Sequence, residues 1–491
     1  MAALAFPRHV HTAPRPCFFS NTPKAKLRTR VSVQSSLTPP QLGFSDPFVL
    51  ELAEALEDSL SSPSSPKLSP LEKIRDVSSE TLLSTPWPSR KDEPFRFTDT
   101  SFIKNSKIYP VSRPPPQSLD APLGSSEDTQ LPHLAVVDGH IVDFGSNLSG
   151  LPDGVYVGSL SNATSESLVK RVGEFVSNFD WGDLFWSING VGAPDLAVVY
   201  VPAGCRVENP VHLTYYSVEA SDEGSNKLPV SNPRVFVLVE KGGEVDIVEE
   251  FMGGDGNRCY WANPVLEVVI GEGGKVRHSY VQNQSPCAAH IKWTSVRQFN
   301  PIFQEAESSY QLVEVSSGGK LSRHNLHVQQ LGPDTMTELS TLHLAFYEQT
   351  QDLHSRLVLD YPRGSSRQLH KCIVANSQGQ AVFDGNVKVN RYAQQTDAGQ
   401  LTRSLLLEPR ATVNVKPNLQ IIADDVKCSH GAAISDLEES QLFYFQARGI
   451  DPKTARKALV FSFGAEVVSQ LPNSFVQKKV KNQIRELLDP Q

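Results

Sequence analysis

The stretch Arg234-Val235-Phe236-Val237-Leu238-Val239-Glu240-Lys241-Gly242-Gly243-Glu244-Val245 joins one β-branched run to a glycine pair and then to the next run. Both alternating faces of the first run are apolar, which is typical of a strand covered on both sides. The pattern of strand, Gly-Gly, charge and strand recurs at 271–276 and 316–321, spaced by 31 and 45 residues. Such self-similarity in a long β-rich stretch is typical of a solenoid or a stacked sandwich. We favour the solenoid, a β-helix in which each coil buries its faces against its neighbours.

Short β-branched runs separated by glycine turns extend this pattern over residues 134–431, which we interpret as the core. Before it, apolar residues recur at helical spacing over 48–60 and again over 71–83. Ser and Pro residues at 61–66 separate these two segments, and a second Pro/Ser-rich stretch at 112–132 predicts a flexible loop. Residues 46–133 are therefore predicted to form an N-terminal helical region.

After Gly431 the pattern becomes helical again, which defines a C-terminal helical domain at 432–491. Ser435 and Glu438 have the spacing of a capping box, and Gly449 stands where a helix C-cap is expected. Asp451 is a candidate N-cap for a second helix that begins with Pro452. Apolar residues at 476, 480, 484, 487 and 488 predict a third helix with one apolar side. The predicted order is helices, a long β region and helices.

The first 45 residues have the composition of a targeting segment. They contain six Lys or Arg and no Asp or Glu, and they lack the apolar core of a secretory signal. A basic, Ser-rich leader of this kind is typical of an organelle transit peptide, and its proline content favours a plastid over a mitochondrion. The alternative is a disordered basic tail. We expect a plastid transit peptide at 1–45 and a chloroplast (stromal) location.

The remaining composition excludes several classes of protein. The net charge of −8 argues against a nucleic-acid partner, which needs clustered positive charge. Six cysteines are scattered without a CxxC pair, so neither a zinc finger nor a disulfide framework is predicted. No run of 18 apolar residues occurs, and we therefore predict no transmembrane helix and no membrane partner.

Two patterns that resemble ligand sites have plainer interpretations. Ser316–Lys320 faintly resembles a phosphate-binding loop, but Glu314 stands where the first glycine is needed and Leu321 replaces Ser or Thr. We interpret it as a β-turn. His324 and His327 are three apart on a predicted strand, so their side chains point to opposite faces and do not form a shared metal site.

The candidate site with the most specific chemistry is Asp424-Asp425-Val426-Lys427-Cys428-Ser429-His430-Gly431. On a strand, Cys428 and His430 are two apart and point to one face. A thiolate beside an imidazole suits soft or borderline metals and iron–sulfur chemistry. One Cys and one His cannot complete a tetrahedral site, so other ligands would come from elsewhere or from a partner. The alternative is a structural thiol beside a core histidine. A further cysteine, Cys372, lies in an apolar run and is expected to be a core thiol.

Several motifs in the last third of the chain resemble the SufD family, the D component of the SUF scaffold for iron–sulfur cluster assembly. The most specific are the 424–431 run and Leu442-Phe443-Tyr444-Phe445-Gln446-Ala447-Arg448-Gly449-Ile450. Val382-Phe383-Asp384-Gly385 and the upstream Pro88-Ser89-Arg90-Lys91-Asp92-Glu93 also match. Gln420 departs from the usual Glu of the family, which weakens any metal or acid role there. The resemblance covers about residues 85–470.

The resemblance implies a right-handed parallel β-helix flanked by helical regions, in a plastid-type SufB–SufC–SufD complex. It implies a non-catalytic scaffold that binds no nucleotide, with a SufB-like paralogue and a SufC-like ABC ATPase as partners. A transient iron–sulfur cluster would assemble at the SufB–SufD interface, with Cys428 and His430 as candidate ligands. The C-terminal helices would dock the ATPase through Phe443, Tyr444, Arg448, Gly449, Ala455, Leu459 and Phe463. From helical spacing alone, the aromatic run at 443–445 is instead expected to pack a helix corner. The alternative function is a β-helical enzyme acting on polysaccharide.

Overall fold

The computed structural model describes residues 46–60, 70–111, 131–176, 181–253, 256–300 and 307–488. The predicted leader at 1–45, the linker at 61–66 and nearly all of the 112–132 loop lie outside these residues. The helices are α1 Pro47–Leu60, α2 Pro70–Leu82, α3 Ser101–Lys104, α4 Glu166–Gly173, α5 Leu184–Gly192, α6 Glu439–Gln446, α7 Pro452–Val468 and α8 Ser474–Leu488, with short 3-10 turns η1 Glu93–Phe95 and η3 Leu160–Asn162.

The strands up to the middle of the core are β1 Lys107–Pro110, β2 His133–Val137, β3 His140–Asn147, β4 Tyr156–Ser159, β5 Ala197–Val201, β6 Val211–Ser217, β7 Lys227–Ser231, β8 Arg234–Val239, β9 Glu244–Gly253, β10 Trp261–Ala262 and β11 Val265–Ile270. The remaining strands are β12 Lys275–Asn283, β13 Ala289–Gln298, β14 Ser309–Ser317, β15 Leu321–Gln330, β16 Met336–Ala345, β17 Thr350–Leu359, β18 Ser365–Val374, β19 Gln380–Val389, β20 Thr396–Leu406, β21 Thr412–Ile421 and β22 Val426–Ser435.

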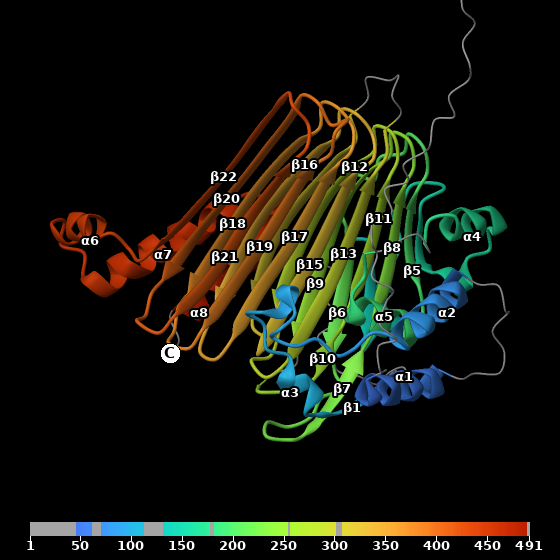
Figure 1. Ribbon diagram of the computed structural model, residues 1–491, viewed down its shortest axis with the longest axis horizontal. Helices are drawn as coiled ribbons and strands as arrows, with labels where there is room; N and C mark the ends of the chain where they lie inside the picture. Colours follow the sequence, from blue (N-terminus) through green and yellow to red (C-terminus); the bar gives the residue numbers. More distant parts are fainter. Residues whose placement is uncertain are drawn as a thin grey trace, which may run out of the picture. The chain divides into compact units, whose positions relative to one another are not determined.

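The core is a parallel β-solenoid made of two facing sheets (Figure 1). Sheet A follows the order β21-β19-β17-β15-β13-β11-β8-β5-β4, and sheet B follows β22-β20-β18-β16-β14-β12-β9-β6-β2-β3. From β11 to β22, successive strands alternate between the sheets, so two strands make one coil. In sheet A, Leu321 pairs with Thr350, Thr350 with Gln380, and Gln380 with Thr412, which sets the later coils at 29, 30 and 32 residues. The predicted mainly β fold with a β-helix core is confirmed.

The three glycine-pair motifs do not occupy equivalent places in the coils. Gly242 and Gly273 both lie where the chain passes from sheet A to sheet B, and the Gly242 N–H donates to the Glu272 carbonyl at 2.7 Å. Gly318 lies at the opposite turn, where the chain passes from sheet B to sheet A. Only glycine fits at this position, because φ is +75° and a Cβ would lie 2.0 Å from the Gln284 carbonyl oxygen. The spacing of 45 residues is therefore about one and a half coils rather than one repeat.

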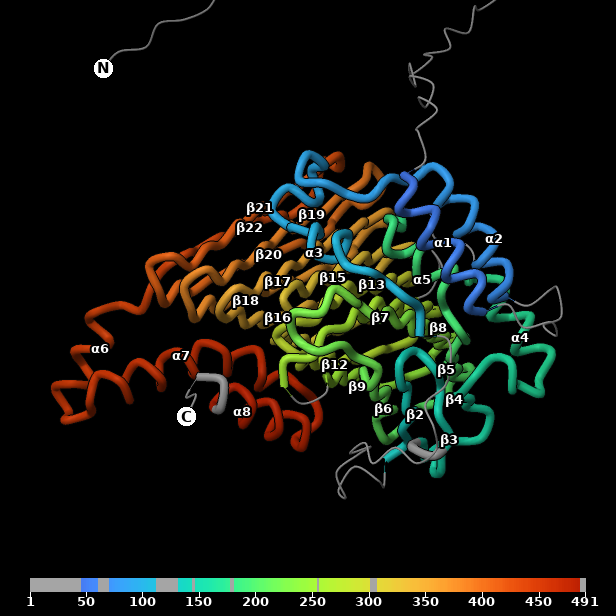
Figure 2. Tube along the Cα trace, turned by 90° about the horizontal axis from the view of Figure 1, so that it is seen from below, coloured from blue at the N-terminus to red at the C-terminus, as the bar shows by residue number. Residues whose placement is uncertain are grey.

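Helices cover the outer faces of the two sheets on opposite sides of the solenoid (Figure 2). Apolar residues of α1, α5 and the segment around Trp87 pack against the outer face of sheet A, as do those of α2 and α4. This explains why β8 is buried on both faces, as its sequence predicts. The β-rich interval 134–431 also contains two helices that the sequence analysis did not predict, α4 and α5, between β4 and β5. These two helices are short, so their helical periodicity is weak against the strand-like composition around them.

At the other end, α7 and α8 pack on the outer face of sheet B. Val467 and Val480 join a cluster with Val313, Leu342 and Ile373. The caps at 449 and 451 are as predicted, since Gly449 has φ +79° and the Asp451 carboxylate accepts the Thr454 N–H at 3.0 Å. The capping box is wrong. Ser435 is the last residue of β22, and Glu438 is the N-cap of α6, but its side chain makes no capping hydrogen bond. Within the described residues, no helix combines the length and apolarity needed to cross a bilayer.

Candidate functional site

Cys428 and His430 lie on β22, in the last coil of the solenoid. Backbone pairing sets Cys428 beside Ala398 and His430 beside Gln400, and both of these neighbours are buried in the interior. The two candidate ligands therefore stand on the inward face of their strand, as the parity argument predicts. Because β22 ends its sheet, no further coil stacks on its free edge within the described residues, and the interior is open at this end. Cys428 remains partly buried, whereas His430 is exposed at the rim.

The surroundings of the two candidate ligands differ. Cys428 packs against the interior apolar cluster, and burial raises the pKa of its thiol, so the protonated form is favoured at neutral pH. A hollow of about 660 Å³ that includes His430 in its lining lies between α7 and strands β16, β18, β20 and β22. It is on the outer face of sheet B, opposite to the inward face on which the His430 side chain stands. Glu466 of α7 and Gln470, which follows that helix, line the side opposite the strands. Within the described residues, no cluster of three or more His, Cys, Asp and Glu side chains could hold a metal ion.

The two strands of the last coil are long and apolar at their open edge. β21 and β22 each span ten residues and terminate their sheets. Ile421, Ile422 and Ile434 are 46%, 53% and 50% exposed at this end. An uncovered edge strand presents unpaired backbone N–H and C=O groups, so natural proteins cover, charge or shorten such edges. This end of the solenoid has the properties of a surface that another chain covers.

The C-terminal helices separate into one that is exposed and two that are packed. α6 has no buried residue, and it projects beyond the sheets in Figure 1. Phe443 and Tyr444 are 71% and 56% exposed, and the Arg448 guanidinium lies 3.5 Å from the Tyr444 ring centroid. The expectation that Phe443 and Tyr444 pack a helix corner is therefore wrong, because no core side chain lies opposite them.

The other predicted docking residues vary in exposure. Gly449 is exposed, whereas Leu459 and Phe463 of α7 are partly buried. The Lys371 ammonium lies 4.2 Å from the Phe463 ring centroid, which ties this ring to sheet B. Ala455 is fully buried within the chain, so it stabilises the fold and presents no surface to a partner.

Three further sequence interpretations agree with the structure, those of the histidine pair, Cys372 and the 318–319 turn. His324 points inward to the Glu314 carboxylate at 2.8 Å, whereas His327 lies on the outer face with its ring 5.7 Å from Trp181. Cys372 is fully buried, and burial raises the pKa of its thiol to about 12. The glycine pair at 318–319 forms the turn between β14 and β15.

Sequence reasoning missed a network of charged and polar side chains inside the solenoid. The Glu249 carboxylate accepts the Lys292 ammonium at 2.7 Å, the Tyr215 hydroxyl at 2.9 Å and the His278 imidazole at 2.9 Å. Burial alone raises the pKa of Glu249, but Lys292 and His278 outweigh it and hold the pKa below its ordinary value. These side chains are all almost completely buried. A buried charge is costly unless it is paired and hydrogen-bonded, as it is here.

A second carboxylate lies two coils further along the interior, since β12 separates β9 from β14 in sheet B. Glu314 accepts His324 Nδ1 and His343 Nε2, both at 2.8 Å, and the His343 ring lies 5.1 Å from that of His370. The two histidines come from different sheets. Burial raises the pKa of Glu314, but the two histidines outweigh it and hold the pKa well below its ordinary value.

Polar side chains continue along the interior toward the rim. Gln400 Nε2 donates to Gln368 Oε1 at 2.9 Å, and Gln368 Nε2 donates to the Ser355 hydroxyl at 2.6 Å. Gln400 is in turn the ladder neighbour of His430. A sequence signal for this network does exist. Charged residues such as Glu249 occur at the same strand parity as Ile247 and Phe251, where a core residue is expected.

Comparison with known proteins places the chain in a family. A family model described as "SUF system FeS cluster assembly, SufBD core domain" matches residues 220–463. "Protein ABCI7, chloroplastic" of Arabidopsis thaliana is 63% identical over 469 residues, covering 96% of this chain and 97% of the relative. An iron–sulfur cluster assembly SufBD family protein of Synechocystis is 34% identical over 421 residues, covering 83% and 89%.

The chain belongs to the SufBD family of iron–sulfur cluster assembly proteins. Within it the chain is SufD-like, since it is 25% identical to Escherichia coli SufD over 416 residues, covering 83% of this chain and 91% of that protein. The predicted resemblance is confirmed. The similarity to a chloroplastic relative supports the plastid location. Family membership does not favour the polysaccharide-active enzyme.

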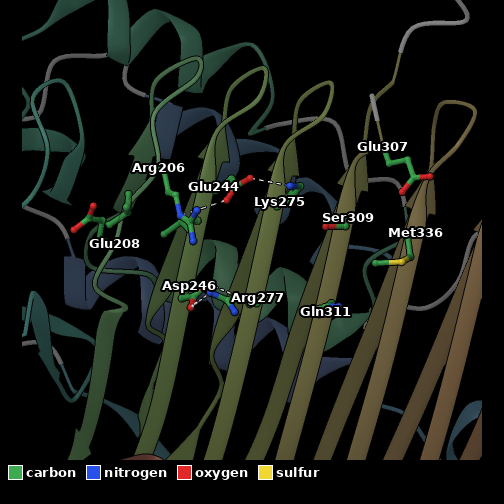
Figure 3. A pocket seen from close by; sticks show the side chains of 12 residues that line it. Arg206, Glu208, Glu244, Asp246, Lys275, Arg277, Glu307, Ser309, Gln311 and Met336 are labelled. Carbon is green, nitrogen blue, oxygen red and sulfur yellow. Dashed lines mark hydrogen bonds and ion pairs between the residues drawn. The ribbon is translucent and has the colours of Figure 1, made fainter. Parts of the chain in front are cut away.

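The outer face of sheet B in this SufD-like chain carries a further hollow of about 450 Å³ (Figure 3). Five of its charged side chains form ion pairs with one another across the strands. Glu244 accepts Lys275 at 2.8 Å, and the Asp246–Arg277 pair lies one step along the same strands at 2.6 Å. Cross-strand pairs of opposite charge support the register of the ladder. These five charged side chains therefore have partners within the chain.

Proposed function

We propose that this SufD-like chain is a non-catalytic scaffold subunit. It pairs edge to edge with a SufB-like paralogue and is moved by a SufC-like ABC ATPase. A transient iron–sulfur cluster, as cargo, assembles at the junction of the two scaffold subunits, with His430 and Cys428 as candidate ligands. The chain itself binds no nucleotide and no nucleic acid.

The observation that carries this proposal is the open last coil. Its two long edge strands offer a row of backbone hydrogen-bonding groups, and exposed isoleucines adjoin them. A parallel solenoid is completed by another chain that adds its own strands to the edge, which is the geometry of β-augmentation. A SufB-like paralogue is the partner with a matching edge, because the family shares the core domain.

The position of His430 supports its role as a ligand. It is exposed on the inward face of the edge strand, so an added coil would face it directly. A neutral imidazole is a good ligand for iron, and a second subunit would supply the ligands that this chain lacks. Cys428 is the weaker candidate, because burial favours its protonated thiol and a metal ligand must be the thiolate.

The exposed helix α6 supports docking of the ATPase. Phe443 and Tyr444 offer two aromatic side chains without a core to pack against, and Arg448 lies beside them. Aromatic and arginine side chains are the residues that most often anchor protein interfaces. α7 joins this helix to the outer face of sheet B. ATP-driven motion of the docked ATPase would therefore be transmitted to the solenoid through α7.

One co-expression experiment with the SufB-like paralogue and the SufC-like ATPase tests the three parts. Ile434→Glu should release the paralogue on size-exclusion chromatography, whereas Val77→Glu, which charges an equally exposed aliphatic residue on α2, should not. The double variant Phe443→Ala/Tyr444→Ala should lose the ATPase and keep the paralogue, with Tyr347→Ala as the exposed aromatic control.

The ligand role is tested on the assembled complex. His430→Ala should leave the complex intact but abolish the visible absorbance that develops on anaerobic loading with iron and sulfide. Normal cluster loading by His430→Ala would refute the ligand role. Retention of the paralogue by Ile434→Glu and of the ATPase by the α6 variant would refute edge pairing and docking respectively.

A further inference from the structure

Two cysteines outside the proposed cluster site lie side by side on neighbouring coils. Backbone pairing sets Trp261 of β10 beside Ala289 of β13, an offset of 28 residues, and the Ala289 N–H donates to the Tyr260 carbonyl at 2.9 Å. Cys259 and Cys287 each lie two residues before this pair, Cys259 in a bridge with Ser221 and Cys287 in the turn that leads into β13. Disulfide-bonded cysteines have Cα atoms about 4.4–6.8 Å apart, which is close to the spacing of neighbouring strands.

The two side chains are in contact with each other. The thiols of Cys259 and Cys287 hydrogen-bond with each other, and both residues are free and partly exposed. Burial, and then the neighbouring thiol, raise the pKa of Cys287 to about 11, so Cys287 keeps its proton at neutral pH. We therefore assign Cys287 to the second step of the exchange rather than to the first attack. Lys320 lies close enough to favour the Cys287 thiolate once it forms.

We propose that Cys259 and Cys287 form a reversible disulfide that fastens β10 to β13. The oxidant is a small disulfide. The Cys259 thiolate attacks one sulfur of that disulfide and releases the first thiolate. The Cys287 sulfur then attacks Cys259, releases the second thiolate and gives up its proton. Two protein thiols are oxidised, and one external disulfide is reduced to two thiols.

The other described cysteines provide internal controls. Cys372 is completely buried, while Cys205 and Cys428 are partly exposed like the proposed pair and pack against the interior cluster. The site does not depend on the proposed scaffold function, because it lies several coils away from β22.

The test uses the full chain, oxidised with glutathione disulfide, blocked with N-ethylmaleimide and digested without reduction. We expect a linked peptide pair containing Cys259 and Cys287, with a mass two hydrogens below the sum of the two peptides. The linked pair should disappear on adding excess dithiothreitol and in Cys259→Ser and Cys287→Ser, and it should persist in Cys205→Ser.

The two single variants also test the order of attack. Cys287→Ser should accumulate glutathione on Cys259, whereas Cys259→Ser should leave Cys287 largely unmodified. Separate labelling of both cysteines by N-ethylmaleimide after oxidation, or linkage of either to another cysteine, would overturn the proposal. Equal glutathione modification in the two variants would overturn the assignment of Cys259 as the attacking thiol.

Discussion

Replacing Lys292 by methionine would leave the Glu249 carboxylate in the solenoid interior without its ammonium partner. The pair joins sheet A to sheet B at 2.7 Å, and both side chains are almost completely buried. Methionine retains much of the length of the lysine stem, so the change removes the charge with little change in packing. The Tyr215 and His278 side chains would still donate to the carboxylate.

The expected cost follows from the two ways in which the variant can respond. If Glu249 stays charged, breaking a buried pair costs about 3–5 kcal/mol. If Glu249 takes up a proton, the cost at pH 7 is about 3.7 kcal/mol, because an ordinary glutamate has a pKa of about 4.3 and each pH unit is worth about 1.4 kcal/mol. We therefore expect the free energy of unfolding to fall by about 3–4 kcal/mol at pH 7. The loss should shrink as the pH is lowered toward about 5.

Urea unfolding followed by tryptophan fluorescence measures this loss, provided that the m-value is unchanged. Lys275→Met is the matched control, since its ammonium pairs with Glu244 at 2.8 Å but is 55% exposed, and it should cost less than about 1 kcal/mol. The double variant Lys292→Met/Glu249→Gln should recover much of the loss. Equal loss of unfolding free energy in the two lysine variants would refute the argument that burial makes the interior ion pair contribute more to stability than the exposed one.

Two further predictions concern the solenoid. Burial lowers the pKa of His290 to about 3, so the folded chain binds fewer protons than the unfolded chain as the pH falls below about 6.5. Its contribution to stability is therefore complete above that pH and is lost toward pH 3. Urea unfolding between pH 6.5 and 4.5 gives the slope of the free energy of unfolding against pH. His290→Gln should reduce this slope by about 1.4 kcal/mol per pH unit. A slope unchanged from that of the parent chain would contradict the prediction. Gly318→Ala should lower the free energy of unfolding by more than about 3 kcal/mol. Gly204→Ala should lower it by about 1–2 kcal/mol, because Gly204 has φ +68° but open space around it. Equal shifts of the melting temperature in the two variants would refute the steric argument.

Local features of the chain were predictable because they depend on neighbours in sequence. The common face of Cys428 and His430 follows from strand parity, and the caps at 449 and 451 follow from backbone stereochemistry and side-chain length. The capping box at Ser435 failed because β22 continues through it. Pairing with β20 outweighs a local capping preference, since the ladder satisfies the same backbone groups.

The sequence by itself determined the alternation of strands and turns, the family resemblance and the chemistry of the 424–431 run. Only the tertiary structure decided which coil lies beside which. It placed Gly318 at the opposite turn from Gly242, and it brought His324 and His343 from different sheets to one carboxylate. It also left Phe443 exposed while burying Ala455. Strand period and turn stereochemistry act over a few residues, whereas burial and pairing depend on contacts about 30 residues apart, and these form only when the coils stack.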